Sequence, residues 1–82
     1  MDIHFRKEDD RVYAVLACGV DVGVVRYDQD AHSLGRWFID GEPQNEEAKK
    51  LFGKRIGHRT RMNAAIVLSR FQSSKVITEM SR

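Results

Sequence analysis

Apolar and polar residues alternate along the first half of the chain in the manner of β-strands. Val20, Val22 and Val24 fall on one side of an extended segment, while Asp21 falls on the other. A nearly continuous run of β-forming residues precedes that segment, which is typical of a central strand covered on part of both faces. The pattern predicts an antiparallel meander of strands. Its four strands are residues 3–7, 11–18, 20–27 and 36–40.

The second half has the apolar spacing of helices. Pro43 suits a position near the start of a helix, the glutamates that follow suit its first turn, and residues 48–52 supply an apolar stripe. Gly53 and Gly57 interrupt this pattern. Because glycine weakens a helix interior, the sequence predicts either two helices or one helix broken near these glycines.

The predicted second helix, from His58 to about Gln72, is apolar on two sides. One face holds Ala64, Val67, Leu68 and Phe71, and the nearly opposite face holds Met62, Ala65 and Ile66. Such a helix must be covered twice, so we expect it to lie between the sheet and the first helix or to pair with a second copy in a homodimer. Arg59, Asn63 and Arg70 line the strip left to solvent.

The end of the chain completes the predicted domain. Lys75 to Met80 alternate between apolar and polar positions, which fits either a fifth, edge strand or a frayed tail. Residues 1–82 therefore predict a single α+β domain. Its four-stranded, mainly antiparallel sheet, with that alternative fifth strand, precedes two helices or one broken helix.

Composition changes this picture mainly through charge. With 41% apolar and 32% charged residues, the chain has the composition of an ordinary globular domain. Residues 1–47 hold eleven acids and five bases, a net charge of −6, whereas residues 48–82 hold nine bases and one acid, a net charge of +8. This asymmetry predicts either an anionic partner for the second half or attraction between the two halves.

Residues for catalysis or metal binding are sparse. His4, His32 and His58 stand far apart and lack the spacing of zinc ligands. Cys18 is the single cysteine and ends an apolar segment, so we expect a buried, unreactive thiol in a reducing compartment. No apolar run approaches the roughly 20 residues that span a bilayer. We therefore expect a cytoplasmic, non-enzymatic protein without a cofactor, a metal or a membrane partner.

The loop "GKRIG", residues 53–57, has features of an anion site. Its glycines let backbone amides approach an anion, and the N-terminus of the following helix favours negative charge. Strands followed by such a loop and a helix resemble the acetyl-CoA-dependent N-acetyltransferase superfamily, whose loop pattern is Q/R-x-x-G-x-G/A. The chain departs from that pattern at Phe52 and Arg55, and its spacer before the loop is longer. The resemblance therefore implies a degenerate domain of that kind and assigns no catalytic residue.

Basic side chains make nucleic acid the favoured partner. Phosphate contacts dominate non-specific affinity, and arginine and asparagine also read base edges. We expect a small regulatory protein that contacts nucleic acid or a nucleoprotein complex, for example an inhibitor or regulator of the mobile-element type. Its predicted nucleic-acid-binding or anion-binding residues are Lys54, Arg55, Arg59, Arg61, Asn63 and Arg70.

Adjacent aromatic residues give an alternative function. Trp37 and Phe38 must point to opposite faces of a strand, and helices cover one face of the predicted sheet. We therefore expect either that one of the two is exposed as a protein-binding anchor or that the pair seals both faces of a small core. The alternative is a protein-interaction module that acts through an exposed sheet aromatic or through a homodimer helix face.

Overall fold

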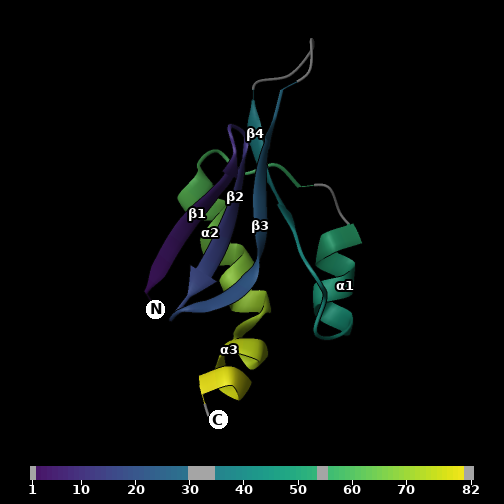
Figure 1. Cartoon of the computed structure of the whole chain (residues 1–82). Coiled ribbons are helices and arrows are strands. Elements are labelled where there is room, and N and C mark those ends of the chain that lie inside the picture. Colours follow the sequence, from purple (N-terminus) through teal and green to yellow (C-terminus); the bar gives the residue numbers. More distant parts are fainter. Residues whose placement is uncertain (1, 30–34, 54–55, 81–82) are drawn as a thin grey trace.

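Strands precede helices in the folded chain (Figure 1). A computed structural model describes residues 2–29, 35–53 and 56–80. The strands are β1 (Ile3–Asp9), β2 (Val12–Ala17), β3 (Val20–Asp28) and β4 (Arg36–Asp40). The helices are α1 (Glu46–Gly53), α2 (Arg61–Phe71) and α3 (Ser73–Met80). None of these described helices is both long enough and apolar enough to cross a membrane.

The strands form one antiparallel sheet in the order β1-β2-β3-β4, which confirms the predicted meander. Cys18 and Gly19 connect β2 to β3 with φ angles of 52° and 80°. Two such residues match the tight hairpin turn whose twist suits neighbouring strands. Cys18 is consequently exposed, and the prediction of a buried thiol is wrong because the turn lifts this residue out of the strand.

An irregularity in β3 changes which valines face the core. The β2–β3 register shifts between Val15 and Leu16, and Gly23 on the facing strand has a φ angle of 139°. Val22 and Val25 are both fully buried, although strict alternation would put them on opposite faces. The prediction that Val22 and Val24 share one face of the strand is therefore wrong, because the alternation of faces shifts by one residue at Gly23.

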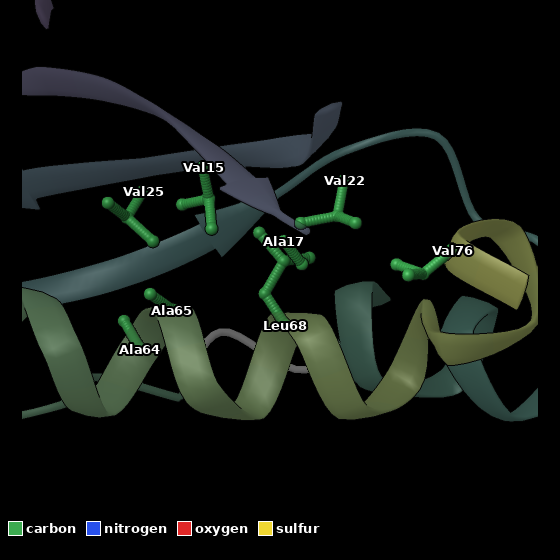
Figure 2. Close-up of a cluster of buried hydrophobic side chains, with 8 residues drawn as sticks. All are labelled: Val15, Ala17, Val22, Val25, Ala64, Ala65, Leu68 and Val76. Atoms are coloured by element: carbon green, nitrogen blue, oxygen red, sulfur yellow. The ribbon is translucent and has the colours of Figure 1, made fainter. Parts of the chain in front are cut away.

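The core lies between one face of the sheet and the helices (Figure 2). Figure 2 shows Ala64, Ala65 and Leu68 pointing from α2 toward the strands. The two alanines were predicted on different faces, but the buried stripe of α2 runs between those faces and includes both, which lets the helix approach the sheet closely. The buried apolar cluster comprises Val15, Ala17, Val22, Val25, Ala64, Ala65, Leu68 and Val76.

The flanks of α2 are only partly covered. Phe71 lines a shallow pocket together with residues at the start of α1, so that flank lies beside α1. On the other flank Met62 is 45% exposed and Ile66 is half-buried. The contacts between α1 and α2 are few, so the predicted placement of α2 between the sheet and α1 is not confirmed. The homodimer stays a prediction.

Helix boundaries follow local capping. The side-chain oxygen of Asn45 accepts a hydrogen bond from the Ala48 N–H at 2.8 Å, which caps α1 and starts it after the predicted Pro43 position. α1 ends at Gly53 and α2 begins at Arg61, so the predicted break separates two helices.

The C-terminal segment forms α3, and the predictions of an edge strand or a frayed tail are wrong. Hydrogen bonds within the helix satisfy its backbone donors and acceptors. Among the α3 side chains that the structure describes, Val76 reaches the core, being 3% exposed. Gln72 links α2 to α3 and is fully buried. Its side-chain nitrogen donates hydrogen bonds to the carbonyls of Glu42, at 2.7 Å, and Val22, at 3.3 Å, which fix this junction to the sheet.

Candidate nucleic-acid interface

The predicted basic strip extends along α2 and the residues before it. Arg59, Asn63 and Arg70 are all exposed, as predicted. A helix rises about 1.5 Å per residue, so Asn63 and Arg70 lie roughly 10 Å apart along the axis. Lys54 and Arg55 lie outside the described residues. The described part of the strip is thus a spread of single side chains and not a compact cluster.

Thr60 determines where α2 begins. Its backbone is extended, and its hydroxyl oxygen accepts a hydrogen bond from the Asn63 N–H at 3.0 Å. The predicted start at His58 is too early, because the His58 N–H and carbonyl form two 2.8 Å backbone hydrogen bonds with Trp37. Arg59 therefore lies on a short link between the edge of the sheet and the first turn of α2.

Arg61 differs from the other predicted basic residues because it packs on the sheet. Its guanidinium carbon lies 4.3 Å from the ring centroid of Phe5 and 4.2 Å from that of Tyr13. A cation over a ring face is attracted by the ring quadrupole. Arg61 is half-buried, so its charge stays at the edge of the core and not on the outer strip.

Four rings, one from each strand, form a continuous row, which we call the aromatic row: Phe5, Tyr13, Trp37 and Tyr27. Successive ring centroids in that order are 6.3, 5.9 and 5.3 Å apart. All four side chains are half-buried. The guanidinium of Arg11 lies 5.8 Å from the Tyr27 centroid. The sequence contains no motif for this row, because only the strand register aligns its members.

Trp37 and Phe38 point to opposite faces of β4, as adjacent strand residues must. Trp37 belongs to the aromatic row, whereas Phe38 lines an open cavity of about 260 Å³ together with Arg26 and Asp40. Both side chains are half-buried, so neither is a fully exposed anchor. Their role in protein binding stays a prediction.

Ion pairs between described residues lie within the sheet and its turns or within α1. Within the sheet and its turns they join Arg6 to Glu8, Arg6 to Asp21, Lys7 to Asp10 and Arg26 to Asp40, and within α1 they join Lys49 to Glu46. The hydrogen bond from Arg6 to Glu8, with the charge of that carboxylate, raises the pKa of Arg6 above its ordinary value. None of these pairs includes Arg59, Arg61 or Arg70.

Comparisons of the chain with protein-family models, curated proteins and solved structures found no match. Within the described ranges, no group of three or more histidine, cysteine or acidic side chains is placed to hold a metal ion. The spacer between β4 and the loop "GKRIG" contains α1. The acetyltransferase-like alternative stays a prediction.

Proposed function

We propose that this chain is a small, non-enzymatic protein that binds nucleic acid, alone or within a nucleoprotein complex, through the basic surface of α2 and the link before it. The observation that carries the proposal is the pairing of charges. Between described residues, the ion pairs of the sheet and its turns join acids to bases of that same region, and Glu46 pairs with Lys49 within α1. None of these pairs includes Arg59 or Arg70. Of the two predicted explanations for the charge asymmetry, this favours an external anionic partner.

The exposed side chains suit a phosphate backbone. Arg59 lies beside the N-terminus of α2, whose free amides also favour an anion, while Arg70 lies in the last turn. Asn63 between them adds an amide able to bond a base edge or a phosphate oxygen. α2 itself contains no acidic residue to repel such a partner.

Salt dependence tests the proposal. Binding of labelled single-stranded and duplex DNA is measured by anisotropy over a range of salt concentrations. Affinity should fall steeply with salt, since each neutralised phosphate contributes a slope of roughly −0.7 to −0.9. The double variant Arg59→Ala plus Arg70→Ala should flatten the slope by about 1.5, the loss of two contacts.

A matched control removes the same charge elsewhere. Arg6 and Arg26 are exposed but already paired with acids, so Arg6→Ala plus Arg26→Ala should change the slope far less. An affinity that does not depend on salt concentration would contradict the proposal. So would an equal flattening of the salt slope in both double variants.

A further inference from the structure

The aromatic row is less deeply buried than the aliphatic cluster on the same face of the sheet. Phe5, Tyr13 and Trp37 pack against the buried cluster, but they remain half-buried, and Tyr27 extends the row beyond that cluster. Large rings that stay partly in contact with water at the end of a core present apolar faces and edges to a ligand. The row therefore has aromatic surface that folding has not fully buried.

An arginine lies over a ring at each end of this row. Arg61 occupies the ring faces of Phe5 and Tyr13, at one end. At the other end Arg11 lies over Tyr27, whose N–H donates to the Arg11 carbonyl at 2.8 Å. Arg59 follows His58, which is hydrogen bonded to Trp37. Guanidinium groups beside rings match a ligand that carries both flat bases and phosphates.

We infer that the chain binds single-stranded nucleic acid, with an unpaired base stacking at the Tyr27 and Trp37 end of the aromatic row. The inference rests on the proposed function and specifies its partner. A single strand exposes base faces to aromatic side chains, whereas a duplex hides them within its own stack. The base stacks at this end because Arg61 covers the two rings at the other end at 4.3 and 4.2 Å, whereas Arg11 lies farther from the Tyr27 ring, at 5.8 Å. The Tyr27 hydroxyl and ring occupy the space that a Cβ at Gly35 would need, so the ring lies against the backbone of this glycine.

The fluorescence of Trp37 provides the readout, since it is the chain's single tryptophan. An unlabelled DNA strand of about twelve nucleotides, within the range of known single-strand sites, is titrated into the protein, and the same strand is titrated as a duplex. The single strand should quench Trp37 fluorescence and bind about tenfold more tightly than the duplex at equal salt. The duplex should leave the fluorescence nearly unchanged.

Two variants locate the stack. Tyr27→Leu should weaken single-strand binding about fivefold to tenfold, because stacking on one ring is lost, and should leave duplex binding unchanged. Phe38→Leu, on the opposite face of β4, is the matched control and should leave both affinities unchanged. Thermal unfolding of each variant confirms that it is folded, and the quenching of the unmodified protein does not depend on either variant.

The outcomes separate the inference from the proposed function. If single strand and duplex bind equally and Trp37 fluorescence does not change, the inference is overturned while nucleic-acid binding stands. If Tyr27→Leu and Phe38→Leu weaken binding equally, the assigned position of the base is wrong. If neither nucleic acid binds, both proposals are overturned together.

Discussion

The two ends of the helix-covered face are built differently. Toward α3, small aliphatic side chains fill the space, and none in that cluster is more than 3% exposed. Toward the start of α2, four rings lie half-buried beneath and beside arginines. Since stabilisation follows the apolar area removed from water, the aliphatic end contributes most to folding for its size. The aromatic end leaves part of its ring surface accessible to solvent.

Leu68→Ala should have the largest effect on stability, because it disrupts the packing of the aliphatic end of the core. Leu68 is fully buried between α2 and the strands, and truncation removes its contacts and leaves a cavity. We expect a loss of about 3 kcal/mol in the free energy of unfolding, measured in urea. A loss below about 1 kcal/mol would mean that this end is not closely packed.

Gly23→Ala should have the second largest effect on stability. It disturbs the position at which the strand alternation shifts so that Val25 faces the core. A Cβ at Gly23 would lie 2.5 Å from the Asp40 carbonyl oxygen, and its φ angle of 139° strains any other residue. We expect a loss of about 2 kcal/mol by the same urea titration.

The matched control for that variant is Gly53→Ala. A Cβ at this last residue of α1 meets no described atom within 4 Å, so the substitution should be neutral or stabilise by about 0.5 kcal/mol. Equal effects at both glycines would refute the steric explanation for Gly23.

Features that depend on neighbouring residues could be predicted from the sequence. The meander followed from local alternation, and the break between α1 and α2 followed from Gly53 and Gly57. The phase change at Gly23 could not be predicted, because it depends on how β2 and β3 pair across a shifted register. α3 was missed because its short alternating pattern suits a strand and a helix equally well.

In the candidate site too, features of a single element could be predicted from the sequence, whereas features that depend on tertiary contacts could not. Exposure of Asn63 and Arg70 could be predicted from a helical wheel, since it depends on one element. Arg59 is exposed as predicted, but it lies on the link before α2 and not on the helix. The aromatic row could not, because its rings come from separate strands that only the tertiary register brings together. Arg61 was predicted as a phosphate contact, and its place over two rings follows from that same register.

Arg61→Met should have the smallest effect and sharpens the comparison at the aromatic end. Methionine keeps an apolar stem over Phe5 and Tyr13 but removes the charge, so only the cation–π attraction is lost. For a half-buried pair we expect a loss of about 1 kcal/mol in the free energy of unfolding. Arg59→Met is the control, because Arg59 is exposed and has no ring beneath it in the described chain, and it should change stability by less than about 0.5 kcal/mol. If the two variants unfold alike, the rings do not hold the Arg61 guanidinium, and the aromatic end is then only a loosely packed margin of the core.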